Sequence, residues 1–352
     1  MRSSIIANHL LINSASVREA LEKINEFSTG QPLVLFLLDE TGRLTGSLTD
    51  GDIRRALLAG VGLGDRVELA ANRNFHSLLE GSPVDRIKFL RESDLKIIPI
   101  VDSGKRVKDL INFKETRTML PVDVVIMAGG KGTRLHPYTK DLPKPMLELD
   151  GKPIIAHNID RLASYGVKNF HISVNHMKEQ IVEFLRSRYT EGNIKIHFIE
   201  EESPLGTIGS VSLSHSYIHS EVMVMNADIL TNIDFEDFYL FFKESKSTMS
   251  IAAFDVRVDV PYAVLETEQN LIKSFVEKPS YLFRSNAGIY LLSQEAVSRI
   301  PRAMRFDAID LMNDLIGGGK SVGYFPIRGY WLDIGNPQNY KKALEDIRHI
   351  RF

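Results

Sequence analysis

The segment Val122–Leu147 constrains the fold of this chain more than any other stretch; its sequence is VDVVIMAGGKGTRLHPYTKDLPKPML. It begins with Val122–Met127, a short and mostly apolar run rich in valine, which predicts a buried strand. A turn with three glycines follows directly: Gly129, Gly130 and Gly132. A buried strand that leads into a glycine-rich turn predicts an α/β sheet with a ligand at the carboxyl end of that strand.

The turn and the residues after it predict a binding site for a polyphosphate. Glycine lets backbone N–H groups approach phosphate oxygens closely, because no side chain intervenes. The segment also carries three cations, Lys131, Arg134 and Lys144, of which arginine offers a planar fork and lysine a point charge. Two other glycine-rich phosphate-binding motifs fit poorly, because the turn has the sequence G-G-K-G-T-R-L. The Rossmann fingerprint requires G-x-G-x-x-G, and a P-loop requires Gly-Lys followed by Ser or Thr.

The same residues resemble a known family. A-G-G-K-G-T-R-L, followed by Lys144 within P-K-P, is similar to the signature of sugar-1-phosphate nucleotidyltransferases, the NDP-sugar pyrophosphorylases. The resemblance runs from about Val122 to the C-terminus and implies a Rossmann-like, mostly parallel, GT-A-like sheet with helices on both faces. It implies catalytic roles for Arg134, Lys144 and Asp228. It also implies nucleotide binding by Ala128, Gly129, Gly130, Lys131, Gly132, Thr133, Gly206 and Thr207.

The rest of residues 121–352 independently favours an α/β fold. Helical spacing predicts helices at 154–165 and 178–188, and apolar runs predict strands at 169–174, 195–199 and 222–226. Strands that alternate with helices in this way form a mostly parallel sheet covered on both faces. Ligands of such sheets bind beyond the carboxyl ends of the strands.

Two carboxylates predict a Mg²⁺ site. Asp228 follows the apolar strand at 222–226, and Mg²⁺ commonly takes one or two protein oxygens together with phosphate oxygens. Taken alone, an Asp after a strand is more often a turn residue. Trp331-Leu332-Asp333-Ile334-Gly335 resembles the W-x-D-x-G motif of the family, which implies that Asp333 is the second metal ligand.

Two further motifs concern the sugar phosphate. Phe275-Val276-Glu277-Lys278-Pro279 resembles the E-K-P motif of the family, in which Glu binds sugar hydroxyls and Lys neutralises the sugar phosphate. The resemblance extends to the strand containing Asn286 and Gly288, which implies that it closes the sugar pocket. The alternative for Glu277 and Lys278 is a solvated pair on the surface.

The segment Pro204-Leu205-Gly206-Thr207 bears on the nucleobase. L-G-T-x-G is similar to the corresponding loop of guanylyltransferases for mannose-like and heptose sugars, which favours GTP as the donor. The alternative is structural, with Ser203-Pro204 starting a turn and Thr207 capping the next helix.

Residues 1–120 contain two similar units. The first reads helix, strand, strand, helix, and a shorter echo follows over residues 84–111. They resemble a tandem pair of CBS domains, an α+β module. That resemblance implies that Thr49 and Asp52, in a T-x-x-D motif, contact the ribose of an adenine nucleotide. The alternative is that both residues cap the helix that begins near Ile53. The second unit lacks the motif.

Composition excludes several classes of protein. Of the 352 residues, 43% are hydrophobic and 25% charged, and the net charge is −2, so neither disorder nor a basic nucleic-acid surface is indicated. The chain has no cysteine, which excludes disulfides and thiolate catalysis. No run reaches the roughly 20 apolar residues of a membrane helix. A cytoplasmic enzyme with no membrane partner is expected, and both resemblances favour a homo-oligomer.

The leading hypothesis is a CBS-linked enzyme that transfers a nucleoside monophosphate from GTP to a sugar 1-phosphate and releases pyrophosphate. The fusion is similar to the glucosamine-1-phosphate guanylyltransferases of legionaminic acid pathways, which implies glucosamine 1-phosphate as the acceptor. Alternatives within the class are mannose or heptose 1-phosphate, or another nucleotide. An alternative of another class is a catalytically inactive protein that senses nucleotides.

Overall fold

The computed structural model describes residues 6–190 and 192–350. The chain forms two compact units, one made mainly of the residues up to Leu120 and the other mainly of those from Pro121 onward. Each has its own buried core. Over the described residues, no helix is long and apolar enough to cross a membrane.

The N-terminal unit contains two small sheets of similar topology. In each, a parallel pair of strands is followed by an antiparallel hairpin, with the orders β1-β2-β3 and β4-β5-β6. The elements of the first are β1 (Leu10–Ile12), α2 (Val17–Asn25), β2 (Val34–Leu38), β3 (Leu44–Thr49), α3 (Asp50–Leu58) and η1 (Val67–Ala70). Those of the second are β4 (Leu78–Leu79), α4 (Val84–Glu92), β5 (Ile97–Val101) and β6 (Val107–Asn112).

The two sheets pack on one another through side chains from both halves. Phe36 and Leu44 of the first half form a buried cluster with Ile97, Val101 and Leu110 of the second. The predicted repeat therefore builds one module with a shared core. Between β6 and Pro121 no helix forms, so the second half lacks the counterpart of α3.

The C-terminal unit is built on a seven-stranded mixed sheet of order β11-β10-β7-β12-β17-β14-β18. Neighbours are parallel except where β17 lies between β12 and β14. The strands are β7 (Val122–Met127), β10 (Asn169–Val174), β11 (Lys195–Glu200), β12 (Glu221–Asn226), β14 (Met249–Asp259), β17 (Ser280–Ser293) and β18 (Val322–Pro326). The predicted α/β fold class is confirmed, and the strands expected at the start of the sheet form where the apolar runs placed them.

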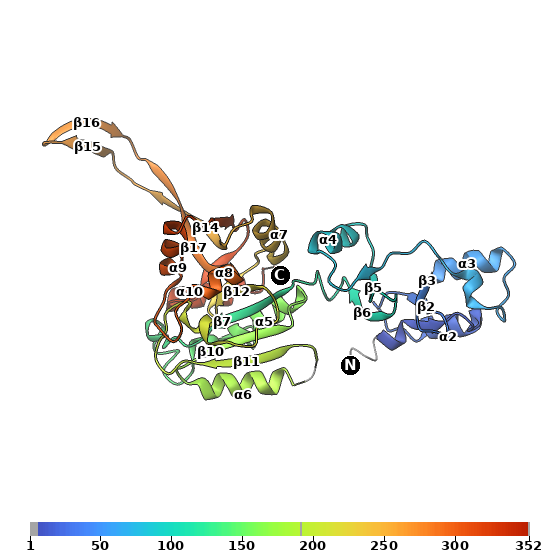
Figure 1. Ribbon diagram of the computed structural model, residues 1–352. Coiled ribbons are helices and arrows are strands. Elements are labelled where there is room, and N and C mark those ends of the chain that lie inside the picture. The colour runs from blue at the N-terminus through green and yellow to red at the C-terminus, as the bar shows by residue number, and fades with distance from the viewer. Residues whose placement is uncertain (1–5, 191, 351–352) are drawn as a thin grey trace. The chain divides into compact units, whose positions relative to one another are not determined.

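Helices and short connections surround this sheet (Figure 1). The helices are α5 (Ile154–Ser164), α6 (Lys178–Arg188), α7 (Phe235–Ser245), α8 (Gln294–Ser298), α9 (Ala308–Gly317) and α10 (Pro337–Asp346). The 3₁₀ turns are η2 (Thr133–Leu135), η3 (Lys144–Met146) and η4 (Gly209–Leu213). The short pairs of strands are β8 (Glu148–Leu149) with β9 (Lys152–Pro153), and β13 (Ile229–Thr231) with β19 (Trp331–Asp333).

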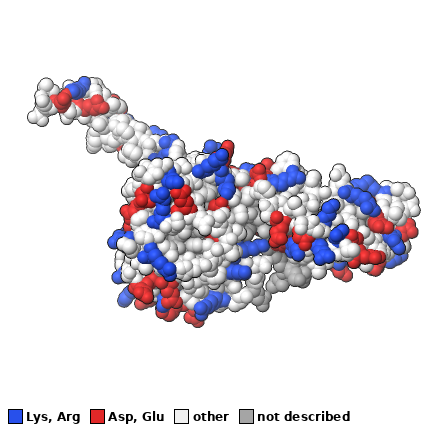
Figure 2. Space-filling model, viewed as in Figure 1, with Lys and Arg blue, Asp and Glu red and all other residues white. Residues whose placement is uncertain are grey.

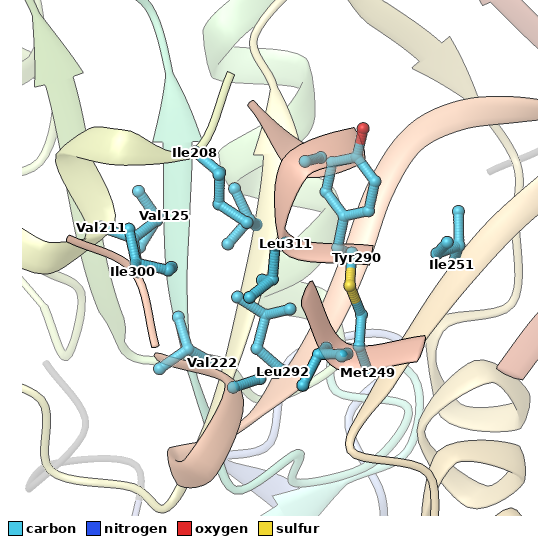
Figure 3. Close-up of a cluster of buried hydrophobic side chains, with 14 of the residues drawn as sticks. Val125, Ile208, Val211, Val222, Met249, Ile251, Tyr290, Leu292, Ile300 and Leu311 are labelled. Atoms are coloured by element: carbon cyan, nitrogen blue, oxygen red, sulfur yellow. The ribbon is translucent and has the colours of Figure 1, made fainter. Parts of the chain in front are cut away.

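Both faces of the central strands are buried. Val125 and Val224, which are paired across β7 and β12, point into a cluster that α8, α9 and η4 complete (Figure 3). Their neighbours Val124 and Met223 point to the opposite face and are also fully buried. Strands buried on both faces are almost entirely apolar, which explains why β7 and β12 were visible in the sequence.

Part of the sheet extends beyond the body as a two-stranded arm, defined here as residues 254–286 (Figure 1). β14 and β17 remain paired out to Asp259 and Ser280. Beyond them β15 (Val264–Glu268) and β16 (Leu271–Val276) form a hairpin. Its two turn residues, Gln269 and Asn270, both have positive φ, as a type I′ turn requires.

Candidate functional site

A cavity of about 380 Å³ opens at the carboxyl ends of β7 and β12, where the α/β pattern predicted a ligand. The parallel pairing of these strands sets Met127 beside Asn226, so the turns that follow them share one edge of the sheet. The cavity is lined by the following residues: Met127, Ala128, Gly129, Gly130, Lys131, Gly132, Thr133, Arg134, Lys144, Pro145, Glu201, Pro204, Gly206, Thr207, Asn226, Ala227, Asp228 and Gly335.

The glycine-rich turn lines the cavity, and two of its glycines are restricted by packing or by backbone conformation. A Cβ at Gly129 would lie 3.2 Å from the Asn175 Cβ, a tight contact that a larger residue could make only if Asn175 shifted by a few tenths of an ångström. Gly132 has a φ of 63°, in the left-handed region that glycine adopts without strain. Its carbonyl accepts a hydrogen bond from Thr139 Oγ1 at 2.8 Å. The backbone of the turn is therefore fixed before any ligand binds.

Gly130 differs from these two glycines, because a Cβ built there would meet nothing within 4 Å. A side chain at Gly130 would therefore enter open space at the cavity lining. Both Lys131 and Arg134 line the cavity and are exposed to solvent. Cations that face an open cavity beside a fixed backbone are suited to bind a phosphate chain.

Lys144 packs beside the glycine-rich turn, since a Cβ at Gly132 would lie 3.1 Å from the Lys144 Cβ, and it lies at the centre of a charged cluster. Its Nζ forms an ion pair with Asp228 and lies 3.8 Å from Asp333 Oδ1. The antiparallel pair of β13 and β19 brings the two carboxylates together, since Ile229 lies opposite Asp333. The backbone adds a bond from Ile334 N to Asp228 O at 3.0 Å. Residues more than 100 positions apart in the chain therefore meet at one lysine.

This cluster carries more negative charge than one lysine neutralises. Burial and the neighbouring charge of Asp228 raise the pKa of Asp333, while Lys144 and Arg134 act in the other direction. Asp333 Oδ1 is buried and accepts no hydrogen bond within the described part of the chain. An unpaired buried acid oxygen beside a second carboxylate fits a divalent cation.

The donor set suits Mg²⁺ bound together with a ligand. Within residues 6–190 and 192–350, no group of three or more metal-binding side chains is found, so protein groups alone would not enclose an ion. Mg²⁺ typically keeps several waters and takes one or two carboxylates plus phosphate oxygens. Asp228 and Asp333 would supply those carboxylates. Their metal role remains a prediction.

Glu201 is a cavity residue that the sequence analysis did not single out. Ser173 Oγ donates to its Oε1, and Leu205 N donates to its Oε2 at 3.0 Å. These bonds hold the carboxylate against the turn at Gly129. Three consecutive glutamates, residues 200–202, gave no signal that the middle one faces inward. Only its position between β11 and the loop that follows could have indicated it.

The loop Pro204–Thr207 forms the edge of the cavity beside Glu201. Gly206 has a φ of 81°, and a Cβ there would lie 2.7 Å from Phe306 O. Thr207 does not cap the turn that follows it, contrary to the structural alternative considered above. Its hydroxyl accepts from Ala308 N at 2.9 Å, at the start of α9, and its own N–H donates to Asp307. The loop is thus anchored to α9.

The predicted sugar-phosphate residues are not in this cavity. Glu277 and Lys278 lie on the arm and are exposed. Asn286 and Gly288 lie at the base of the arm, where Asn286 Nδ2 donates to Tyr290 OH at 2.9 Å. Gly288 has no room for a side chain, because a Cβ would lie 2.6 Å from Asn226 Nδ2. The strand therefore reaches the cavity wall at Gly288, whereas the E-K-P motif does not reach it.

In the N-terminal unit Thr49 and Asp52 form a capping box at the start of α3. Asp52 N donates to Thr49 Oγ1 at 3.2 Å, and Thr49 N donates to Asp52 Oδ2 at 2.8 Å. Arg55 occupies the other carboxylate oxygen. The helix-capping alternative is therefore confirmed. A nucleotide at these residues would have to replace bonds that already exist, and this role remains a prediction.

Three comparisons agree with this picture. The family model described as nucleotidyl transferase matches residues 123–349, more than half of the chain. The CBS domain model matches residues 13–59, the first of the two similar N-terminal halves.

Curated relatives match the C-terminal part. A mannose-1-phosphate guanyltransferase of Schizosaccharomyces pombe is 35% identical over 228 residues, 61% of each chain. That of Saccharomyces cerevisiae is 32% identical over 227 residues, 61% of this chain and 62% of the relative. The chain thus spans about three fifths of the length of these relatives. The crystal structure of HddC from Yersinia pseudotuberculosis, also solved with GMP-PN, is similar with 30% identity and a TM-score of 0.51, covering 64% of this chain and 99% of HddC.

Proposed function

The chain belongs to the nucleotidyl transferase family, and we propose that it transfers GMP from GTP to a sugar 1-phosphate, releasing pyrophosphate. One observation carries the proposal. A single cavity holds the glycine-rich turn with Lys131 and Arg134 and, packed beside Gly132, Lys144 between two carboxylates. An inactive nucleotide sensor has no need of the paired carboxylates.

The chemistry requires charge neutralisation more than proton transfer. A phosphate oxygen of the sugar 1-phosphate attacks the α-phosphorus of GTP, and the bond from that phosphorus to the β-phosphate oxygen breaks. The electron pair leaves with pyrophosphate. Both reactants are anions, and the attacking oxygen of the sugar 1-phosphate is already deprotonated near neutral pH. The site must therefore hold the two reactants in line and neutralise their charge.

The residues of the cavity divide this work between them. The backbone of the glycine-rich turn, with Lys131 and Arg134, would bind the departing β- and γ-phosphates. Lys144 would stabilise the charge that develops at the α-phosphate. Asp228 and Asp333 would hold Mg²⁺, which supplies further positive charge to the phosphates when bound. No histidine base is needed for such a transfer.

Guanine as the base is supported by Glu201 and by the names of the relatives. Guanine presents N–H donors on one edge, and a fixed carboxylate at the cavity wall is an acceptor for such donors. Both Glu201 oxygens retain a free lone pair beyond their bonds to Ser173 and Leu205. Glu201→Gln is expected to lower kcat/KM for GTP about tenfold, since one acceptor becomes a donor.

For the acceptor we propose glucosamine 1-phosphate, which the resemblance of the CBS fusion to the enzymes of legionaminic acid pathways implies. The curated relatives favour mannose 1-phosphate instead, because they carry that name. The two sugars differ at C2, both in configuration and in the amino group. A few pocket side chains would therefore decide between them.

The test is product identification. The full chain with Mg²⁺ is incubated with each of four nucleoside triphosphates and with glucosamine, mannose and heptose 1-phosphates, and the products are identified by mass spectrometry. GDP-glucosamine is the expected product. A GDP-sugar of another kind would correct the acceptor alone. Absence of any NDP-sugar and of pyrophosphate would refute the enzyme and favour the sensor.

We also propose that the N-terminal module binds an adenine nucleotide at Thr49 and Asp52. Calorimetry of the full chain with AMP, ADP and ATP tests this, with Asp52→Asn as the matched variant. Binding that Asp52→Asn weakens supports the proposal. Binding that is unchanged in Asp52→Asn would place the ligand in the transferase cavity.

A further inference from the structure

We infer that the arm, residues 254–286, crosses to a second copy of this chain and places Glu277 and Lys278 at that copy's cavity. The inference rests on the proposed function, since it assigns these residues to the sugar 1-phosphate. Three observations support it: the exposed apolar side chains of the arm, the place where the arm leaves the sheet, and the set of cations that line the cavity.

The arm has no core of its own. Not one residue from 254 to 286 is buried. Large apolar side chains are exposed along its length, for example Phe275 at 64%, Ile272 at 61% and Leu282 at 59%. In Figure 2 its shaft is mostly uncharged. An isolated two-stranded ribbon is marginally stable in water, so this one needs a surface to pack against.

Apolar residues pair across the arm. Val256 lies opposite Phe283, and Val258 opposite Tyr281. Residues directly opposite in a ladder share a face, so these four side chains form one apolar stripe on the shaft. In the distal hairpin the apolar pairs lie on both faces, Leu265 opposite Phe275 and Val264 opposite Val276. Exposed apolar pairs along a ribbon mark a docking surface.

The arm leaves the sheet at the edge where the cavity lies. Met225 of β12 pairs with Ile289 of β17, so the residues before Gly288 extend past the carboxyl end of β12. From there the strand runs outward: Asn286 to Ser280 alone spans about 20 Å at about 3.3 Å per residue. Glu277 and Lys278 are carried away from the cavity of their own chain.

The cavity lacks what those two residues would provide. Its lining cations are Lys131, Arg134 and Lys144, and the proposed function assigns all three to the nucleotide, so a second phosphate needs a cation from elsewhere. The arm offers Lys278, exposed and next to the exposed Glu277. Two-fold symmetric exchange of an identical element is a common and low-cost route to a dimer. In such a dimer each arm would complete the other copy's site.

Crosslinking tests the inference without turnover. The chain has no cysteine, so one introduced thiol is unique. Ser280→Cys on the arm and Ser203→Cys at the cavity edge, carried on two differently tagged full-length chains, are co-expressed and treated with a short bismaleimide. We expect a product that contains both tags. Ser187→Cys, exposed on α6, replaces Ser280→Cys in the matched control, in which no mixed product is expected.

The doubly substituted chain, Ser203→Cys with Ser280→Cys, distinguishes the alternative. A link that forms only within one chain would overturn the inference and show that the arm folds onto its own cavity. No link in either arrangement would overturn it as well. A chain that crosslinks between copies but makes no NDP-sugar would refute the proposed function alone.

A mixing experiment gives a second readout. At sugar 1-phosphate concentrations well below KM, Lys144→Ala is expected to be nearly inactive and Lys278→Ala to be about tenfold slower or more. In a co-expressed mixture, random pairing makes half of the dimers mixed, and each mixed dimer has one site free of both substitutions, so about a quarter of the wild-type rate returns. Failure to recover activity in the mixture, with both single variants folded, would contradict exchange of the arm.

Discussion

The two halves of the proposed site are built in opposite ways. The nucleotide half, from the glycine-rich turn to Lys144 and Asp228, is held by buried strands, tight glycine contacts and backbone bonds. The sugar-phosphate residues Glu277 and Lys278 lie on an arm in which no residue is buried. Both halves resemble motifs of one family, yet only the residues of the first line the cavity.

This difference shows that a motif fixes chemistry but not location. The nucleotide half needs a fixed shape, because its donors must already point at phosphate oxygens when the ligand arrives. The arm, by contrast, is exposed within a single chain. Its apolar stripe would gain stability only by packing against another surface. Five predictions run from the largest effect to the smallest, three on the two halves of the site and two on a buried carboxylate beneath the cavity.

Lys144→Ala is expected to have the largest effect. The side chain of Lys144 is only 12% exposed and lies between two carboxylates, so its removal leaves the α-phosphate without its cation. The rate of pyrophosphate release should fall by about 10²–10³-fold. Lys140→Ala, an exposed lysine outside the cavity, is the control and should retain full activity. A Lys144→Ala variant that keeps more than a tenth of the rate would refute this role.

Asp123→Asn should destabilise the body beneath the cavity. This fully buried carboxylate in β7 accepts from Ile218 N at 2.9 Å and from His219 N at 2.7 Å. Loss of one acceptor oxygen should lower the free energy of unfolding by about 1–3 kcal/mol near neutral pH. The control is Asp141→Asn, an exposed position, which should change it by less than about 0.5 kcal/mol.

The same carboxylate predicts a dependence on pH. Burial alone raises the pKa of Asp123, but the nearby His171 ring and the hydrogen bonds from Asn169 and the His219 backbone outweigh it and hold the pKa below its ordinary value. The stabilisation is therefore complete above about pH 4 and is lost as pH falls through the lower folded-state pKa. Denaturant titrations from pH 7 to pH 3 should show a smaller acid-induced loss for Asp123→Asn than for the wild type. Parallel pH profiles for the two proteins would contradict this assignment.

Lys278→Ala should affect the acceptor and not the donor. If this lysine holds the sugar phosphate, its loss should raise the KM for the sugar 1-phosphate about tenfold or more, which lowers the rate at low substrate, while the KM for GTP stays unchanged. Lys273→Ala lies on the same arm, where Lys273 pairs with Glu268, and should leave both KM values unchanged. An equal rise in the two KM values would indicate damage to the fold.

Phe275→Ser should have the smallest effect on stability. Phe275 is 64% exposed at the outer part of the arm, so in a dilute solution of separated chains its loss should change the free energy of unfolding by less than about 0.5 kcal/mol. If the arm docks on a second copy, the same substitution should destabilise only at concentrations where copies associate. Unfolding measured over a range of protein concentrations separates the case of single chains from the case of associated copies. A large decrease in the free energy of unfolding at every concentration would show that the arm packs within its own chain.

Much of the fold was visible in the sequence. Strands such as β7 and β12 are buried on both faces, so they appear as apolar runs that need no tertiary information. The glycine-rich turn and Asp228 follow strand ends that lie at one edge of a parallel sheet, and their meeting in one cavity followed from topology. Lys144 and the family were predicted from the sequence motif, and membership of the nucleotidyl transferase family was confirmed.

Other features depended on the tertiary structure. Glu201 became a cavity residue because Ser173 and Leu205 hold its carboxylate inward, and its flanking glutamates look identical in sequence. Thr207 was available to cap either neighbouring element, and packing against α9 decided between them. The sequence by itself determined which chemical groups are present around Val122–Leu147. Only the tertiary structure decided that Glu277 and Lys278 lie outside that cavity, because the direction of a β-ribbon is set by its pairing and not by its side chains.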